Sequence, residues 1–332
     1  ITSASNLLLN GSFESGINSW DSENIEATDV VDTTFDSGAH SIKFASDDKT
    51  DKYISQTVNI SKNAPYTLSV KVKSAEANAD SKLTLLLEFS DAHGDMQNIE
   101  EREITAVGGD FQTYSLQIAP KAFVGSGKIT VSIGLGDSNG EFYVDSAMLE
   151  EGNGIGEYDY LQNGNFEIGT DNNINGWNSE NSYIKRTDII CNRSKTMLSF
   201  PQASINNNVE FSQSITLNGK KGDVISFGGW YRGKYVASDT TMNLKTANGQ
   251  DVTSALRLLK DRNAGFKVTY NYVDDDGKTA TDSIFVSAKQ YIKNWQYLAD
   301  DVTLKGDCTE VTFSFVYENL PGTPSIAEVS LH

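Results

Sequence analysis

The 332-residue sequence is poor in the residues from which catalytic and transition-metal sites are usually built. It contains three histidines, His40, His93 and His332, and two cysteines, Cys191 and Cys308. The cysteines are far apart and show no CxxC pair or zinc-ligand spacing, so a zinc site is not expected. A disulfide closing the second half and two buried free thiols both stay open, because spacing alone does not give disulfide geometry.

Long apolar runs and positive charge are also scarce. No apolar run approaches the roughly 18 residues of a membrane helix, so we expect no membrane insertion. Only 27 Lys and Arg oppose 45 Asp and Glu, giving a net charge of −18 and a pI near 4.5. Such a chain repels phosphate backbones, so we expect no nucleic-acid partner, whereas neutral ligands and cations stay open. Residue 1 is Ile without a basic and apolar leader, so we expect a mature segment.

The residues that are abundant favour a folded chain of many short strands. Hydrophobic residues make up 38% and aromatic residues 10% of the sequence, which argues against disorder. There are 27 glycines but only 5 prolines, and Asn, Ser, Thr and Asp separate the short apolar runs, as is typical of strands joined by tight turns. The length exceeds that of one ordinary hydrophobic core, so we expect two domains.

An internal repeat supports the two-domain interpretation. The segment Asn10–Glu14, followed by Trp20, returns as Asn163–Glu167, followed by Trp177. Further matches pair 68–73 with 227–232 and 129–133 with 311–315, and the second copy carries a 25-residue insertion between Arg232 and Trp295. We therefore predict domains at residues 1–155 and 156–332, joined by the glycine-rich segment 152–156.

Alternation of apolar and polar residues predicts strands in both copies. Residues 66–73, 83–89 and 129–133 alternate in the first copy, and 266–272 alternate in the second. Successive strand side chains point to opposite faces, so this period of two predicts half-buried antiparallel strands. The predicted fold class is all-β, with two tandem β-sandwich jelly rolls. One short helix is allowed at residues 256–260, inside the insertion.

The opening motif resembles a known family. Asn-Gly-x-Phe-Glu, a Trp shortly after it and a closing strand at 144–149 are similar to carbohydrate-binding modules of the jelly-roll families four, nine and twenty-two, which are galactose-binding-domain-like. The join from Met148 through Tyr158 to Gly164 resembles tandem modules of clostridial wall-associated and Rhs-type surface proteins. The resemblance implies sugar recognition, other domains of a larger surface protein as partners, and an extracellular or cell-wall location in a Gram-positive bacterium.

The same resemblance implies a structural Ca²⁺ ion. Carried over, Glu14 and Asp145 become its side-chain ligands, with main-chain carbonyls near Ser12 and in the loop that begins at Asp36. Calcium takes six to eight oxygens and accepts such a mixed shell. The second copy keeps the glutamate as Glu167, but Ala327 stands where Asp145 should be, which argues against a metal there. The alternative is that both glutamates cap local main-chain amides.

Trp230 is the leading candidate for sugar contact. The alternation places Phe227 and Tyr231 in the core and Trp230, Gly228 and Arg232 on the other face, and we expect Gly228 to leave open surface beside the indole. The alternative is that Trp230 packs under the insertion.

Other aromatic residues and the first copy are weaker candidates. In the first copy we expect Glu88 on one polar face together with Ser69, Lys71, Lys73, Thr84 and Leu86, flanked by Tyr53. Three further tryptophans, Trp20, Trp177 and Trp295, are interpreted as structural.

Two motifs that mimic functional loops are predicted to be hairpin turns. Gly136–Gly140 fits GxSxG, but strand-like residues follow it and the only later histidine is His332. The segment 274–277 lacks the first and twelfth ligands of an EF-hand loop. We therefore expect no enzymatic activity, and non-catalytic carbohydrate binding as the function. A structural spacer or adhesion stalk without a sugar site is the alternative, and a glycosidase ranks third.

Overall fold

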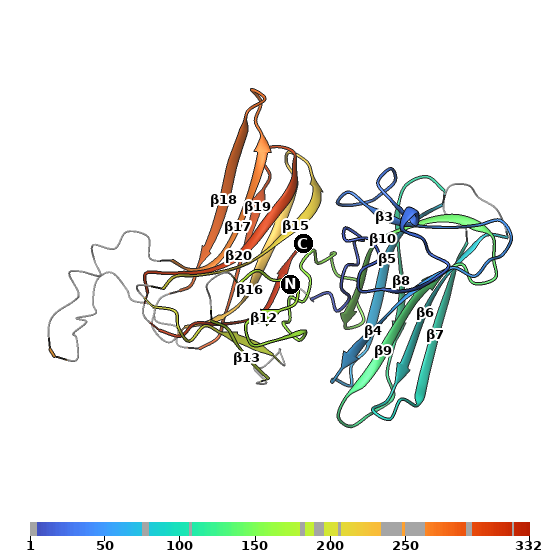
Figure 1. The fold of residues 1–332 in the computed structure, drawn as a ribbon, viewed down its shortest axis with the longest axis horizontal. Coiled ribbons are helices and arrows are strands. Elements are labelled where there is room, and N and C mark those ends of the chain that lie inside the picture. The colour runs from blue at the N-terminus through green and yellow to red at the C-terminus, as the bar shows by residue number, and fades with distance from the viewer. Residues whose placement is uncertain are drawn as a thin grey trace. The chain divides into compact units, whose positions relative to one another are not determined.

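The computed structural model describes residues 5–74, 80–105, 108–179, 183–188, 196–204, 207–233, 248–249, 263–289, 294–320 and 322–332. Within these residues the regular elements are strands and one short 3₁₀ turn, Ala27–Asp29 (Figure 1). No helix in this described part is long and apolar enough to cross a membrane. The chain divides into two compact units, 1–162 with 216–218, and 163–215 with 219–332.

The first unit is a sandwich of two five-stranded antiparallel sheets. One sheet has the order β1 (Asp21–Glu23), β4 (Tyr53–Ile60), β9 (Gly127–Gly134), β6 (Lys82–Ser90) and β7 (Met96–Thr105). The other has the order β2 (Val30–Val31), β3 (Ser41–Ser46), β10 (Gly140–Glu151), β5 (Tyr66–Ser74) and β8 (Gln112–Ile118).

The predicted alternation builds the core of this sandwich. In β6, Leu83, Leu85 and Leu87 are fully buried, whereas Thr84 and Glu88 point to the partly exposed outer face. Apolar residues of β4, β5, β9 and β10 meet them in the same cluster. Burial of side chains of this size stabilises the fold by about 1.5–3 kcal/mol each.

The second unit repeats the strand order of the first. Its five-stranded sheet runs β13 (Lys185–Thr187), β14 (Met197–Ser199), β21 (Ser325–Leu331), β16 (Val224–Arg232) and β19 (Gln296–Thr303). Its four-stranded sheet runs β15 (Val209–Gly219), β20 (Cys308–Glu318), β17 (Asn263–Val273) and β18 (Thr279–Ser287). A small hairpin, β11 (Gly169–Thr170) and β12 (Asn173–Ile174), is added near its start. The predicted pair of all-β sandwiches is confirmed.

Several local predictions are also confirmed. Residues 136–140 form the β9–β10 turn, and 274–277 form the β17–β18 turn, with positive φ at Gly277 (+77°). Trp20 and Trp177 are core residues, 6% and 9% exposed, and each indole N–H donates to the carbonyl of the asparagine that opens its copy, at 3.0 and 3.2 Å.

Two predictions stay untested. Residues 256–260, where a helix was allowed, lie outside the described residues, as does Cys191. Cys308 is a buried free thiol at the start of β20, and burial raises its pKa.

The linker packs into the first unit. The units divide after Gln162, seven residues beyond the predicted boundary. Tyr158 and Tyr160 stack edge to face at 5.1 Å, and Leu161 is 1% exposed. The main-chain N–H of Asn6 donates to Asp159 Oδ2 at 3.3 Å, so residues 156–162 complete the first unit.

Candidate functional site

In the first unit a buried carboxylate anchors the loop between β2 and β3. Asp145 lies in β10 opposite Lys71 of β5 and is 0% exposed. Its Oδ2 accepts hydrogen bonds from the main-chain N–H groups of Asp36 and Ser37 at 2.9 and 3.0 Å, and its Oδ1 accepts one from Ser146 at 2.6 Å. The carboxylate therefore fixes the start of the 36–40 loop.

Glu14 anchors the other end of the same loop. Its Oε1 accepts from the N–H groups of Ala39 and His40 at 2.8 and 3.1 Å, and its Oε2 lies 3.1 Å from His40 Nδ1. Gly38 has φ +68°, and a Cβ there would collide with the Glu14 carboxylate, so the loop requires glycine at this position. The predicted ligand residues Glu14, Asp145 and Asp36 thus come together at one loop. The carboxylates of Glu14 and Asp145 accept from main-chain amides, which for Glu14 is what the alternative interpretation predicted.

The electrostatics around Asp145 are unusual for a carboxylate. Burial raises the pKa of Asp145 to about 7, although the hydrogen bonds from Ser37, Asp36 and Ser146 oppose that rise. The buried Tyr158 hydroxyl lies in the field of Asp145 and is hydrogen-bonded to Ser12, and burial raises its pKa. Among the described residues, no group of three or more Asp, Glu, His or Cys side chains could hold a metal ion. A Ca²⁺ ion would therefore need main-chain oxygens beside the two carboxylates.

The second unit replaces this arrangement with an arginine. Ala327 of β21 pairs with Trp230 of β16, in the register position of Asp145 and Lys71. Arg186 of β13 donates from Nε to the Phe166 carbonyl at 2.9 Å and from Nη2 to the Glu167 carbonyl at 2.8 Å. In the second unit a guanidinium therefore holds the carbonyl oxygens of the opening motif, and the position of Asp145 is taken by Ala327.

The outer face of the β13-β14-β21-β16-β19 sheet carries a group of four side chains, Trp230, Arg232, Trp295 and Tyr297, which we call the aromatic platform. The rings of Trp230 and Tyr297 are 5.4 Å apart and inclined at 61°. The Arg232 guanidinium lies 5.1 Å from the Trp295 ring centre, within cation–π range. Tyr297 is 39% exposed and Trp230 is half-buried, so the platform offers aromatic surface to solvent.

Gly228 has a different role from the one expected. The sequence predicted open surface beside Trp230, but Gly228 is buried and pairs with Ala299 of β19. A Cβ at Gly228 would meet the Leu298 carbonyl oxygen at 2.5 Å, so glycine is needed for close approach of β16 and β19. The insertion that could cover Trp230 lies outside the described residues apart from 248–249.

The single polar face predicted for the first unit does not exist. Ser69, Lys71 and Lys73 belong to β5, and Thr84, Leu86 and Glu88 belong to β6, in the opposite sheet. Alternation assigns inner and outer faces but not the sheet, and the chain crosses the sandwich between these strands.

Tyr53 and Glu88 do share an outer face. Tyr53 and Thr84 both pair with Gly134, on either side of β9. Glu88 lies four residues beyond Thr84 on β6, which is about 13 Å along the strand at ordinary strand rise. The Tyr53 hydroxyl donates to Glu23 at 2.9 Å. The two residues are thus separate points on a polar surface.

A family of known proteins matches the first unit. The family model of a carbohydrate binding domain matches residues 5–146. The first unit is carbohydrate-binding-module-like. No curated protein matches the chain.

Solved structures of carbohydrate-binding modules are similar to this chain at low identity. The tandem family 22 modules of Xyn10C from Paenibacillus barcinonensis are 14% identical, with 99% of this chain and 98% of that one covered and a TM-score of 0.35. The C-terminal family 22 module of Xyn10B from Clostridium thermocellum is 15% identical over 44% of this chain and 94% of its own, with a TM-score of 0.33. TmCBM61, solved with β-1,4-galactotriose, is 20% identical over 45% of this chain and 99% of its own, with a TM-score of 0.34.

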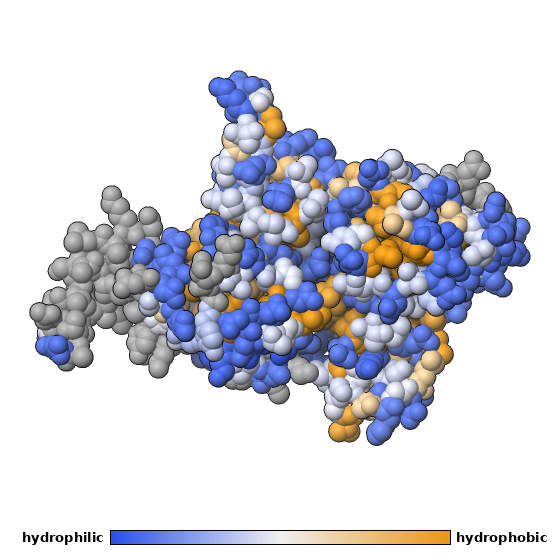
Figure 2. All heavy atoms as spheres, viewed as in Figure 1, coloured by the Kyte–Doolittle hydropathy of each residue, from blue (hydrophilic) through white to orange (hydrophobic). Residues whose placement is uncertain are grey.

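Sequence reasoning missed Tyr297 of the second unit, although a signal was present. Gln296 and Leu298 are buried in β19, so the alternation places Trp295 and Tyr297 together on the outer face beside Trp230. Hydropathy alone does not mark the site: Figure 2 shows a largely hydrophilic surface with scattered apolar patches, and a hydrophilic tip on the β17–β18 hairpin.

Proposed function

We propose that the protein is a non-catalytic carbohydrate-binding segment of an extracellular or cell-wall-associated protein of a Gram-positive bacterium, and that the aromatic platform contacts the sugar. The family match of residues 5–146 supports carbohydrate binding. The observation that carries the choice of site is the pair of the half-buried Trp230 and the exposed Tyr297 beside Arg232. Other domains of a larger surface protein are the proposed partners.

The platform has the chemistry that a sugar requires. Pyranose rings pack their C–H faces on aromatic rings, and guanidinium N–H groups donate to hydroxyl oxygens. Ala327 of β21 lies opposite Trp230 and Ala299 of β19 lies opposite Gly228, so Tyr297 is the large side chain that the neighbouring strands place beside the indole. A polysaccharide chain could therefore lie flat across β16 and β19.

Substitution of Trp230 tests the site. We expect Trp230→Ala to weaken binding to a responding glycan on an array by about 1–3 kcal/mol, because one large apolar contact is lost. The melting temperature should change little. Val224→Ala is the matched control, because Val224 is exposed on the same strand, and it should bind as the parent does.

The same variant distinguishes a structural spacer. If the insertion covers Trp230, Trp230→Ala should destabilise the second unit by about 3–5 kcal/mol, as truncation of a core tryptophan does. That result, together with a parent protein that binds no glycan on the array, would contradict sugar binding by the platform.

We also propose that one Ca²⁺ ion is held in the first unit by Glu14, Asp145 and main-chain oxygens near Ser12 and Asp36. The support is the buried Asp145 carboxylate, which accepts hydrogen bonds from the neutral main-chain N–H groups of Asp36, Ser37 and Ser146. Calcium should raise the melting temperature of the first unit, and chelator should lower it. Glu14→Gln should abolish both responses, and an identical melting curve with and without chelator would refute the site.

A further inference from the structure

The β11–β12 hairpin is an addition to the second copy. Six positions separate Glu14 from Trp20, whereas ten separate Glu167 from Trp177. The backbone around these four extra residues is hydrogen-bonded in the same way in both copies. The main-chain N–H of Trp20 donates to the Ile17 carbonyl, and that of Trp177 donates to the Ile174 carbonyl. The four extra residues therefore form a hairpin on an otherwise shared frame.

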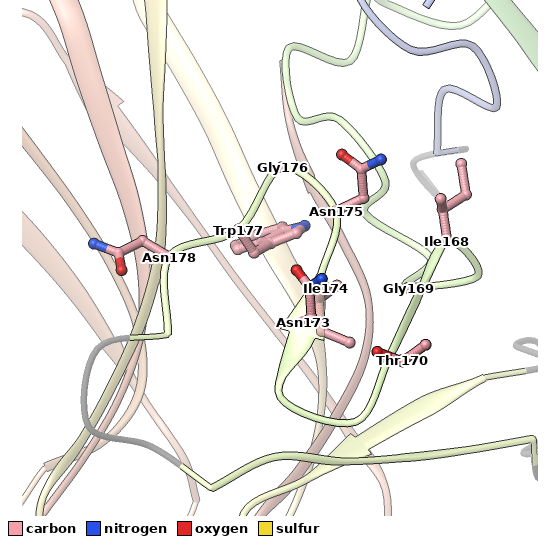
Figure 3. A pocket seen from close by; sticks show the side chains of 9 residues that line it. All are labelled: Ile168, Gly169, Thr170, Asn173, Ile174, Asn175, Gly176, Trp177 and Asn178. Carbon is pink, nitrogen blue, oxygen red and sulfur yellow. The ribbon is translucent and has the colours of Figure 1, made fainter.

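This hairpin lines an open surface pocket of about 790 Å³, a volume within the range of small-molecule sites. Figure 3 shows the side chains of Asn173 and Asn175 between the indole of Trp177 and the side chains of Ile168 and Thr170 in this view. Ile168 is 40% exposed, and Ile174 is buried below the hairpin. The pocket thus combines apolar surface with amide and hydroxyl groups.

Two asparagine amides in the pocket are available for a ligand. The side chains of Asn173 and Asn175 are exposed, and within the described part of the chain neither amide has a hydrogen-bond partner. An asparagine amide donates from its nitrogen and accepts at its oxygen. The two amides can therefore both donate hydrogen bonds to hydroxyl groups and accept hydrogen bonds from them.

The backbone that carries these amides is held in place. The Asn163 side chain donates to the carbonyls of Ile168 and Asn175 at 2.7 and 2.9 Å, and accepts from Ile168 N–H at 3.1 Å. Asn172, with φ +61°, accepts from Ile184 N–H at 2.7 Å. Because these bonds exist without ligand, binding would not need to order the loop.

We propose that this hairpin pocket is a second carbohydrate site, separate from the aromatic platform, which takes a short neutral saccharide. No Lys, Arg, Asp or Glu side chain lines it, so it has no group to pair with an ionic ligand. Amides for hydroxyl groups and apolar side chains for C–H faces match a neutral polyol. The choice of ligand class rests on the proposed function, whereas the site itself does not.

The test uses the full chain, with xylohexaose, cellohexaose and β-1,4-galactotriose as probes in ¹H–¹⁵N spectra and calorimetry. We expect at least one probe to shift the indole N–H signal of Trp177 in the Trp230→Ala protein. Adding Asn173→Ala and Asn175→Ala to that protein should weaken the binding at least tenfold. Asn153→Ala, at an exposed asparagine in the first unit, is the control and should have no effect.

The two sites can fail independently. If the Trp230→Ala protein binds no probe, or binds as well after the two asparagine substitutions as before, the hairpin site is overturned. If the asparagine substitutions abolish all binding whereas Trp230→Ala changes none of it, the hairpin site stands and the platform fails.

Discussion

At the scale of single residues, Asp145 combines full burial with three main-chain donors. Its nearest cationic side chain across the sheet, Lys71, pairs with Asp36 at 4.0 Å. A buried carboxylate without a paired charge favours its protonated form, and burial raises the pKa of Asp145 to about 7. The hydrogen bonds by which Asp145 holds the 36–40 loop are therefore sensitive to pH near neutrality when no cation is bound.

This pKa gives stability a defined pH dependence. The folded state binds the Asp145 proton more tightly than the unfolded chain does, because the pKa of this side chain is 3.8 in the unfolded chain. The contribution to stability is therefore greatest below about pH 4 and is lost as pH rises to about 7. The difference in unfolding free energy between the parent and Asp145→Asn should fall by about 4 kcal/mol between pH 4 and 8 in calcium-free buffer. A difference that is constant with pH, in denaturant titrations, would contradict the assignment.

The opening motif predicted Glu14 and Asp145 as neighbours of the 36–40 loop, because their residue types and positions carry the family resemblance. It could not predict that the loop turns its amides toward them, since that depends on the positive φ of Gly38. Arg186 was not predicted at all. Two of its partners are main-chain carbonyls, which any sequence supplies, and a third is Asp188, at 3.3 Å.

At the scale of strands, the apolar period predicted 66–73, 83–89 and 129–133 to within two residues of the ends of β5, β6 and β9, whereas β17 begins three residues before the predicted 266–272. It did not assign β5 and β6 to different sheets, because a two-residue period defines faces and says nothing of pairing partners. Tyr297 was missed because the alternation that marks it covers only the start of β19 and is interrupted by three consecutive exposed residues, 299–301.

Arg186 links β13 to the opening motif of the second unit, and its loss should be measurable. Arg186→Ala should destabilise the second unit by about 1–3 kcal/mol, because two carbonyl acceptors lose a charged donor. Arg186→Lys should restore only part of this, since one ammonium cannot reproduce the fork of the guanidinium. Calorimetry of the full chain measures the effect, with Lys185→Ala, at the exposed neighbouring residue, as the control. Equal melting of all three variants would show that these contacts contribute nothing.

At the scale of the whole molecule, the repeat predicted two domains but placed their boundary too early to include the linker residues that the first unit buries. The glycine-rich segment 152–156 looked like a linker, and the residues after it match the start of the second copy. Asp159 aligns with Asn6, and both accept a hydrogen bond from the main-chain N–H two residues later. Sequence similarity assigned residues 156–162 to the second copy, whereas their packing assigns them to the first.

Fragments test this division directly. Residues 1–162 should fold alone, because Tyr158, Asp159 and Leu161 then remain in place. Residues 1–155 should melt at least about 6 °C lower, since about 3 kcal/mol or more of burial is lost. Thermal unfolding followed by circular dichroism measures both, and fragments of equal stability would return the boundary to residue 155.

The facing pairs Lys71–Asp145 and Trp230–Ala327 have a consequence for the history of the chain. If the two copies descend from one ancestral module with the first pair, the order of change is constrained. A tryptophan opposite Asp145 would confront a buried carboxylate with a bulky indole, whereas an alanine opposite lysine removes the buried carboxylate and leaves the lysine partly exposed. On this premise the aspartate was lost first, and the aromatic surface evolved afterwards. Tandem relatives with a Trp–Asp pair at these positions would contradict that order.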